Sequence, residues 1–320
     1  MNEYFFSHAR TALKYGLINL NLNNNSEILI PSYICDSIIF PLDDLNLNYV
    51  FYDININLST NWDDLNKKIS INTSAVLYVN YFGIPNEIHK FENFAFTNKI
   101  KLVEDNSHGY IGIKNKNLLN SNADFIISAP RKHLPLSYGG SLFSKKQFEI
   151  PDLPKIRTTT NQKFKFIINH RFPKIKKLLK YQSLNSYINN FSNSNFELKI
   201  DDQLLDQFSL SIIMKTNWSG LQNYKMLNFN KWKNFCKINN FTSLYSDEIS
   251  YFNPWCYPIL TNSKIQKNKI IIWLKKNKII AFSWPTLPLD VNNLSKHLSE
   301  YVICLSTYSS PLNENEIIKF

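Results

Sequence analysis

Two short stretches of the chain carry side chains that could do acid–base or nucleophilic chemistry. Residues 103–110 have the sequence VEDNSHGY, which contains the carboxyl group of Asp105 and the imidazole of His108. Residues 127–140 have the sequence ISAPRKHLPLSYGG, which contains the amine of Lys132. An amine must lose its proton before it attacks a carbonyl carbon, and burial or a nearby cation lowers a lysine pKa toward that state. These residue types predict a site that handles protons around a reactive amine.

Each stretch also has a purely structural interpretation. An aspartate is common at the end of a strand or helix, where it caps a turn, and His108 would then be satisfied in the core. Lys132 would be a surface lysine in a loop bounded by Pro130 and Pro135. Neither stretch by itself decides between the two interpretations.

The use of glycine points to the same part of the chain. The chain has only 7 glycines, whereas average usage is about 7% of residues. Those that fall between residues 83 and 140 are Gly83, Gly109, Gly112, Gly139 and Gly140. A chain this sparing with glycine is expected to keep it where backbone geometry or close approach requires it. We therefore expect the chemistry in this region.

The apolar pattern of the first half predicts the elements that position these residues. Strands are expected at residues 26–31, 48–52, 74–79, 101–105 and 123–128, and a helix at residues 87–98. Short apolar runs separated by helices indicate an α/β fold with a mostly parallel sheet, covered on both faces. Ligands of such sheets gather at the carboxyl ends of the strands. Because Asp105 and Lys132 lie at or just past successive strand ends, their side chains are expected to meet.

The second half predicts a smaller α+β domain. Helices are expected at residues 219–236 and 268–276, and strands at residues 256–260 and 301–305. We predict a large domain over residues 1–205 and a small C-terminal domain over residues 206–320. The boundary is uncertain, because residues 155–205 are polar and basic and show no clear element.

The net charge of +11 is concentrated in one segment. Between Asp152 and Glu197 the chain has no acidic residue. The basic residues of this segment are Lys155, Arg157, Lys163, Lys165, Arg171, Lys174, Lys176, Lys177 and Lys180. Such a run suits an anionic partner, either a nucleotide diphosphate, an acidic membrane surface or a nucleic acid, and it also fits a solvated basic face.

The remaining composition favours a cytoplasmic protein with reduced thiols. The cysteines are far apart and form no CxxC pair: Cys35, Cys236, Cys256 and Cys304. Neither a zinc site nor a disulfide framework is expected from this spacing. The chain has no uncharged apolar run of about 18 residues, and its start lacks the pattern of a signal peptide. We therefore expect no transmembrane segment.

Four stretches, taken together, resemble the DegT/DnrJ/EryC1/StrS family of sugar aminotransferases. These fold-type I enzymes depend on pyridoxal 5'-phosphate (PLP) and act mainly on nucleotide-linked keto sugars. Residues 103–110 are similar to the family's EDxA(H/Q) strand end. The resemblance implies that Asp105 bonds the pyridine nitrogen of PLP and that His108 lies beside the ring. A carboxylate at that nitrogen keeps it protonated, so that the cationic ring takes up the electrons of a substrate carbanion.

The second stretch, residues 127–140, resembles the family's S-x-x-x-K…GG segment. The resemblance implies that Lys132 forms the Schiff base with PLP and that Ser128 bonds the cofactor phosphate. After the substrate amine replaces it, a freed lysine can also move a proton on the substrate. Tyr138 stands where the family usually has an acidic residue before the glycine pair.

The third stretch, residues 7–13, has the sequence SHARTAL and is similar to the family's SGRTAL start. In the family this helix start holds the cofactor phosphate, a place favoured by unpaired backbone N–H groups and the helix dipole. The resemblance implies that Arg10 and Thr11 bind the phosphate here. Ala9 replaces the family's glycine.

The fourth stretch is in two parts, PSYIC at residues 31–35 and NYFGIP at residues 80–85. They resemble the family's PxYTC and hYfGxP strand ends. Many members place an aromatic residue that stacks on PLP where Cys35 stands, so we expect Cys35 beside the cofactor. The residues expected to line the substrate pocket are Tyr33, Tyr81, Arg131 and His133.

The resemblance implies a homodimeric PLP-dependent aminotransferase with its active site at the subunit interface. Its expected substrates are an amino-acid donor, glutamate by resemblance, and a nucleotide-linked keto sugar used for a cell-surface polysaccharide or another glycan. No nucleic-acid partner is expected. Two alternatives stay open. One is a PLP-dependent sugar dehydratase, because the family's dehydratases use histidine as the anchor and His133 follows Lys132. The other is a non-catalytic relative kept for binding or assembly.

Overall fold

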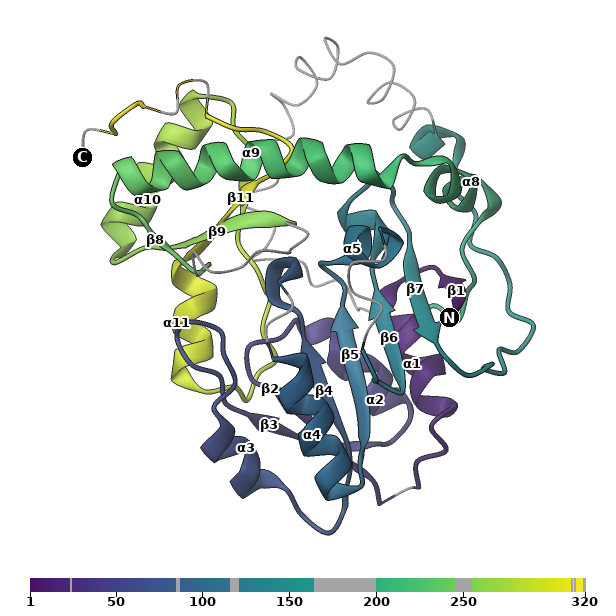
Figure 1. Cartoon of the computed structure of the whole chain (residues 1–320). Helices are drawn as coiled ribbons and strands as arrows, with labels where there is room; N and C mark the ends of the chain where they lie inside the picture. Colours follow the sequence, from purple (N-terminus) through teal and green to yellow (C-terminus); the bar gives the residue numbers. More distant parts are fainter. Residues whose placement is uncertain are drawn as a thin grey trace.

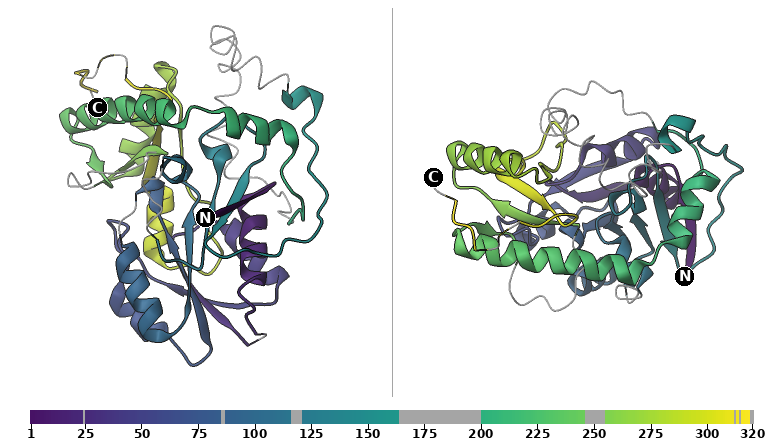
Figure 2. Two further views of the ribbon diagram at one scale, coloured as in Figure 1. Left: turned by 45° about the vertical axis from the view of Figure 1, so that its right-hand side comes forward. Right: turned by 90° about the horizontal axis from the view of Figure 1, so that it is seen from above.

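The computed structural model of the chain contains two sheets, and a long helix runs from one to the other (Figures 1 and 2). It describes residues 1–23, 25–84, 87–115, 121–163, 200–245, 255–311, 313 and 315–318.

The first sheet has seven strands and lies in the first half of the chain. They are β1 (Asn2–Phe6), β2 (Glu27–Pro31), β3 (Asn48–Tyr52), β4 (Thr73–Val79), β5 (Lys101–Asn106), β6 (Phe125–Ser128) and β7 (Gly140–Ser144). Their order is β1-β7-β6-β5-β4-β2-β3. Neighbours from β3 across to β6 pair in parallel, and β7 runs antiparallel to both β6 and β1. The predicted mostly parallel α/β sheet is confirmed.

Short helices connect these strands and cover the sheet. They are α1 (Ala9–Ile18), α2 (Ile39–Asp44), α3 (Trp62–Lys68), α4 (Ile88–Asn98) and α5 (Tyr110–Lys114), with 3₁₀ turns η1 (Asp36–Ile38), η2 (Tyr81–Gly83) and η3 (Pro130–Lys132). Parallel strands need crossover connections, and helices on the faces bury both sides of the sheet. This explains why the central strands are apolar along their length: residues such as Leu29, Val76, Val103 and Ile127 are fully buried.

The second sheet belongs to the C-terminal part. Its strands are β8 (Thr242–Ser243), β9 (Cys256–Leu260), β10 (Ala281–Phe282) and β11 (Val302–Ser306), in the antiparallel order β10-β11-β9-β8. The helices are α8 (Gln207–Lys215), α9 (Trp218–Ile238), α10 (Lys264–Lys276) and α11 (Asn293–Tyr301). A separate apolar core forms here, around Trp232, Phe235 and Leu274. The smaller α+β unit is thereby confirmed.

Helix α9 links the two parts. Its 21 residues start against α5, beside the large sheet, and end against β8 and β9 of the small one (Figure 1). Because α9 contacts elements of both parts, the boundary between residues 205 and 206 stays a prediction.

The structure also bears on the expectations about the basic segment, the cysteines and membrane-spanning helices. Of the nine basic residues in the charged segment, Lys155, Arg157 and Lys163 are described, and the other six lie outside the described residues. All four cysteines are free thiols. Within the described ranges, no helix has both the length and the apolar character needed to cross a membrane.

Candidate functional site

The carboxyl ends of β5 and β6 bring the two predicted stretches together. Asp105 pairs with Ile127 and Asn106 with Ser128 in the parallel register, so the two strands end at the same edge. His108 lies in the turn after β5, and Lys132 lies in η3 just after β6. This register, rather than proximity in sequence, assembles the site.

The amine of Lys132 is enclosed by aromatic rings, although part of the residue is exposed. Its Nζ lies 4.8 Å from the ring centroid of Trp255 and 5.8 Å from that of Trp284. Burial lowers the pKa of Lys132 to about 8, even though the negative charge of Asp105 opposes this effect. Lys132 is therefore a far better nucleophile near neutral pH than an exposed lysine.

Asp105 is a buried carboxyl group whose charge interacts with that of the Lys132 amine. Its Oδ1 accepts a hydrogen bond of 2.9 Å from the backbone N–H of Ser107. Burial raises the pKa of Asp105, and the positive charge of Lys132 and the bond from Ser107 oppose that rise. A cation that reaches Asp105 would replace lost hydration, so this carboxyl group is suited to bind a protonated ring nitrogen.

His108 offers an unused hydrogen-bond donor. The backbone N–H of Phe82 donates to its Nδ1 at 3.0 Å, so Nδ1 carries no proton. Burial lowers the pKa of His108 well below its usual value, so the ring is neutral and its proton is on Nε2. This buried Nε2 has no hydrogen-bond partner among the described residues. An orphaned buried donor of this kind suits an acceptor on a ligand.

Aromatic rings hold the His108 imidazole in place. It is stacked between Phe82 and Trp255, with ring centroids 5.9 Å and 4.2 Å away. Trp284 meets it edge-on at 4.6 Å. The indole of Trp255 thus lies against both the His108 ring and the amine of Lys132.

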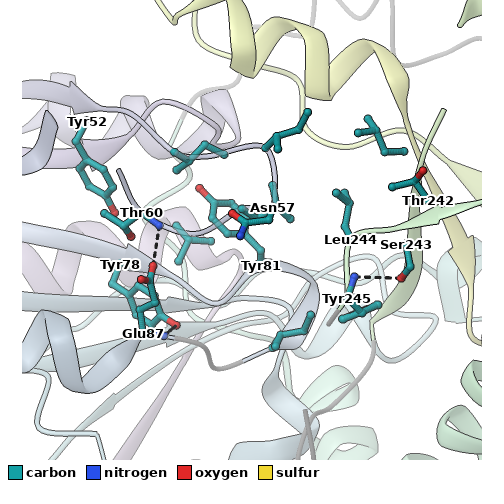
Figure 3. Close-up of a pocket in the computed structure, with 16 residues that line it drawn as sticks. Tyr52, Asn57, Thr60, Tyr78, Tyr81, Glu87, Thr242, Ser243, Leu244 and Tyr245 are labelled. Carbon is teal, nitrogen blue, oxygen red and sulfur yellow. Dashed lines mark hydrogen bonds between the residues drawn. The ribbon is translucent and has the colours of Figure 1, made fainter. Parts of the chain in front are cut away.

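The two expected pocket tyrosines use their hydroxyl groups inside the protein. Tyr33 is fully buried and donates to the carbonyl oxygen of Trp284 at 2.6 Å. Tyr81 donates to the carbonyl oxygen of Tyr33 at 2.7 Å. Tyr81 also lines a cavity of about 380 Å³ between the large sheet and the small one (Figure 3). Tyr52, Asn57 and Tyr81 line one side of it, and Thr242, Ser243 and Leu244 line the other.

The other predicted residues near the strand ends differ in burial and in hydrogen bonding. Cys35 lies just before η1, close enough for the charge of Lys132 to act on its thiol, and burial raises its pKa. Ser128 donates its hydroxyl proton to the carbonyl oxygen of Asn106 at 2.7 Å. Arg131 is exposed, and His133 is fully buried, with its carbonyl oxygen accepting the hydroxyl of Tyr308.

The start of α1 forms a second group of polar side chains, which holds an anion of the chain itself. Ser7, His8 and Thr11 surround the carboxylate of Asp201. Close packing shapes this corner, since a Cβ on Gly140 would lie 2.1 Å from the backbone of His8. Arg10 is half-buried, and burial lowers the pKa of its guanidinium. Of the two residues predicted to bind phosphate, Thr11 is thus already bonded to a carboxylate.

Sequence reasoning missed the participants that come from the second half of the chain. Trp255 and Trp284 cover Lys132, and Asp201 lies at the start of α1. A signal for Asp201 was present, because Asp201 and Asp202 follow a long stretch in which Glu197 is the only acid after Asp152. The tryptophans have no comparable signal, since an isolated tryptophan is equally expected in a core.

This donor set fits PLP. It contains an amine with a lowered pKa for the aldehyde, a buried carboxyl group for the ring nitrogen and an imidazole N–H that finds no acceptor in the described part of the chain. The hydroxyl groups at the start of α1 are arranged around an anionic group, here the carboxylate of Asp201.

Comparisons with known proteins agree with this fit. The model of the DegT/DnrJ/EryC1/StrS aminotransferase family matches residues 5–124, which include Asp105 and His108 and end before Lys132. GDP-4-keto-6-deoxy-D-mannose 3-dehydratase of Escherichia coli O55:H7 is 31% identical over 86 residues, or 27% of this chain and 22% of the relative. The matched part is thus less than a quarter of that curated relative.

Solved structures share the fold along almost the whole chain. The PseC aminotransferase of Helicobacter pylori has a TM-score of 0.67 at 16% identity, over 96% of this chain and 81% of PseC. The PLP form of the putative sugar aminotransferase Spr1654 of Streptococcus pneumoniae has a TM-score of 0.67 at 17% identity, over 95% of this chain and 81% of Spr1654. The family model thus matches the first part of the chain, less than half of its length, and the solved structures share the fold over almost all of it.

Proposed function

We propose that this chain is a PLP-dependent aminotransferase that transfers an amino group from an amino acid, such as glutamate, to the keto group of a nucleotide-linked sugar. The observation that carries the proposal is the enclosed amine of Lys132, with its pKa lowered to about 8. It lies beside Asp105 and the Nε2–H of His108, which has no acceptor among the residues that the structure describes. Burying a charged lysine costs free energy of folding, so a buried lysine with a lowered pKa is typical of a functional site that uses the neutral amine.

The residues at the ends of β5 and β6 divide the chemistry between them. PLP, when bound, supplies an aldehyde carbon that exchanges amino groups and a ring that takes up electrons. Lys132 would anchor it and, once freed, move a proton at the substrate carbon next to nitrogen. Asp105 would hold a proton on the ring nitrogen, and His108 would donate its Nε2–H to an acceptor on the ring. Trp255 and Trp284 would keep water away from the amine.

The cavity beside Tyr81 is the space that we assign to the substrate. Its volume of about 380 Å³ falls within the range of ligand sites. It lies between the carboxyl ends of β3 and β4 and the strands β8 and β9, where the two sheets face each other (Figure 3). Tyr81 connects it with the amine site, because the charge of Asp105 contributes to the raised pKa of Tyr81.

We also propose the setting of the reaction. PseC of Helicobacter pylori is described as involved in the biosynthesis of pseudoaminic acid, which supports a role in making a cell-surface polysaccharide or another glycan. The free thiols of all four cysteines suit the reducing cytoplasm. A homodimer that completes the active site from two chains is the expected assembly, and light scattering of an active monomer would contradict it.

A sugar dehydratase is the second candidate, because the matched curated relative is a dehydratase. A dehydratase that follows the family's histidine-anchored pattern would use His133. Here it is the amine of Lys132 whose charge interacts with Asp105, whereas His133 is fully buried and its pKa is lowered well below the usual value by burial and the charge of Lys225. This difference favours transamination.

A single-turnover experiment separates the two candidates. Protein loaded with PLP is mixed with glutamate, and 2-oxoglutarate and pyridoxamine phosphate are measured. The aminotransferase predicts stoichiometric formation of both products, followed by return to PLP when a nucleotide-linked keto sugar is added. Loss of water from the sugar, with no amino group incorporated, would establish the dehydratase instead.

A further inference from the structure

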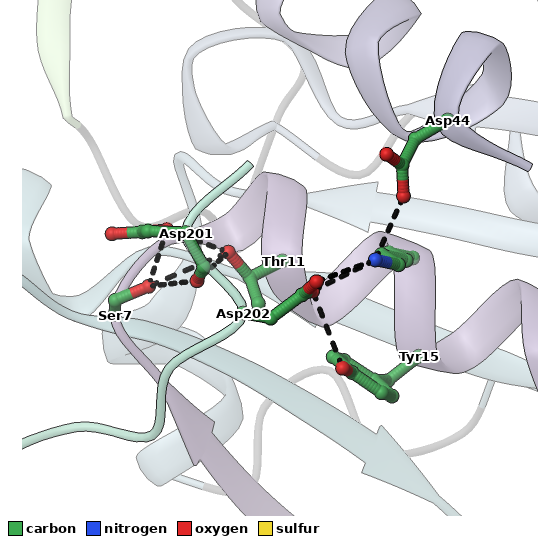
Figure 4. A network of polar contacts seen from close by, with 7 residues as sticks. Ser7, Thr11, Tyr15, Asp44, Asp201 and Asp202 are labelled. Carbon is green, nitrogen blue, oxygen red and sulfur yellow. Dashed lines mark hydrogen bonds and ion pairs between the residues drawn. The ribbon is translucent and has the colours of Figure 1, made fainter. Parts of the chain in front are cut away.

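The segment that precedes α8 places a carboxylate at the start of α1. Oδ1 of Asp201 accepts hydrogen bonds from Ser7 Oγ at 2.8 Å and from Thr11 Oγ1 at 3.1 Å (Figure 4). Its Oδ2 lies 3.0 Å from Nδ1 of His8. Thr11, one of the two residues predicted to bind the phosphate, and its neighbours Ser7 and His8 are therefore already bonded to an anion.

Backbone contacts fix this segment against the large sheet. The N–H of Ser7 donates to the carbonyl oxygen of Gln203 at 3.0 Å, and the N–H of Leu205 donates to the carbonyl oxygen of Phe5 at 3.3 Å. Asp206 then caps α8 by accepting the N–H of Ser209 at 3.0 Å. The residues that follow Asp201 are thus fixed to the large sheet and to α8, which holds Asp201 at the start of α1.

The electrostatics show that Asp201 acts as an anion here. Burial alone would raise its pKa, but the hydrogen bond and charge of His8 and the bonds from Ser7 and Thr11 outweigh burial and hold the pKa below its usual value. Asp201 is therefore ionised at neutral pH. An ionised carboxylate and a phosphate dianion repel each other, and one set of donors cannot saturate both.

The next residue provides an internal comparison. The carboxylate of Asp202 points to the side of α1, where it accepts from Lys14 Nζ at 2.8 Å and from Tyr15 at 3.2 Å (Figure 4). Lys14 also forms an ion pair with Asp44 at 2.7 Å. Two adjacent carboxylates thus have separate partners, and only Asp201 takes up the donors of the anion site.

We propose that Asp201 is a built-in competitor for the phosphate group of the cofactor, so that an anion binds at the start of α1 only when the segment around Asp201 gives up its contacts. This inference rests on the proposed function, because it assigns the phosphate of PLP to that site. Occupancy of the protein by cofactor then depends on release of Asp201 as well as on reaction at Lys132.

Binding of two aldehydes to matched variants tests the competition. Asp201→Asn keeps an oxygen acceptor and removes the charge, and Asp202→Asn removes a neighbouring charge outside the anion site. Quenching of tryptophan fluorescence gives Kd for PLP and for pyridoxal, which lacks the phosphate. Asp201→Asn should bind PLP about tenfold more tightly or better and bind pyridoxal as the wild type does. Asp202→Asn should match the wild type with both.

The opposite results overturn the inference. If Asp201→Asn binds PLP no more tightly than the wild type, or gains equally for pyridoxal, Asp201 does not compete with the phosphate. Circular dichroism checks the fold of the variant, and Asp201→Ser serves in its place if the asparagine variant does not fold.

Inorganic phosphate separates this inference from the proposed function. If neither aldehyde binds any variant, the proposed function fails, and the rise in Tm caused by inorganic phosphate still tests the anion site. A larger rise in Asp201→Asn than in both the wild type and Asp202→Asn supports competition by Asp201. Equal rises in all three proteins overturn it.

Discussion

The two ends of the proposed cofactor site differ in how far the chain satisfies its own polar groups. At the strand ends, the Nε2–H of His108 has no partner among the described residues, and the pKa of Lys132 is lowered by burial. At the start of α1, Ser7 and Thr11 are bonded to Asp201. Unsatisfied buried groups gain free energy when a ligand binds, whereas satisfied ones must first exchange partners. The strand ends are therefore expected to set reactivity, and the helix start to set affinity.

The largest effect is expected from removing the amine. Lys132→Ala should abolish the covalent adduct with PLP, because the aldehyde then lacks its nucleophile, whereas His133→Ala should keep it. The adduct is reduced with borohydride and located by peptide mass spectrometry. Modification at Lys225 in the wild-type protein would contradict this assignment, since burial lowers the pKa of that amine too, to about 7.

The next largest effect is expected from removing the charge of Asp105, which would bind the ring nitrogen of the cofactor. Asp105→Asn should keep bound cofactor and slow the glutamate half-reaction about 100- to 1,000-fold, because an amide cannot hold a proton on the ring nitrogen as a carboxylate does. The single-turnover rate gives this loss, and the PLP content of the purified variant serves as its control. A near-normal rate would reduce Asp105 to a residue that only caps the turn at Ser107.

A smaller effect, on the pH dependence of stability, is expected from the buried amine of Lys225. Lys225 on α9 is fully buried and contacts Thr307 Oγ1 at 3.2 Å and the carbonyl oxygen of Trp255 at 3.5 Å. Its folded-state pKa of about 7 lies below the ordinary 10.5. Between these values the unfolded chain binds more protons, so the free energy of unfolding rises with pH. This rise should be about 2 kcal/mol between pH 7 and pH 9.

Lys225→Met should remove that part of the pH dependence and be more stable than the wild type at pH 7. Urea unfolding at the two pH values measures the difference. Lys231→Met, at an exposed position of the same helix, should change little. Equal pH slopes in Lys225→Met and the wild type would show that Lys225 stays charged in the folded protein.

The smallest effect is expected at the start of α1. Thr11→Val keeps the shape of a fully buried side chain and removes one hydrogen bond to Asp201, so the free energy of unfolding should fall by about 1 kcal/mol. The same substitution in Asp201→Asn should cost less, because the acceptor is then uncharged. A cost that is unchanged in the double variant would mean that Thr11 contributes by packing and not through Asp201.

The sequence predicted the central strands and the carboxyl ends that carry the site. The strands expected at residues 74–79 and 101–105 became β4 and β5, because buried parallel strands are apolar on both faces and stand out from their neighbours. The helix expected at residues 87–98 became α4. With these elements in order, the meeting of Asp105 and Lys132 followed from the geometry of a parallel sheet.

Two strands of the large sheet, the edge strand β1 and its neighbour β7, were not predicted. Phe6 of β1 pairs with Gly140 of β7, and Asn2 pairs with Ser144, so the two strands are far apart in the sequence. Neither strand has a long apolar run, and β7 begins directly after a glycine. Such strands are stabilised by the partner with which they pair, so a local pattern gives little sign of them.

By itself, the sequence determined which residue types stand at each strand end and in what order, since apolar periodicity and the placement of glycine are local properties. The tertiary structure alone decided which distant side chains meet them. Trp255 and Trp284 cover Lys132, and Asp201 binds Ser7 across 194 positions of the chain. Contacts of this kind depend on the path of the whole backbone, because hydrogen bonds and ring contacts act over only a few ångströms.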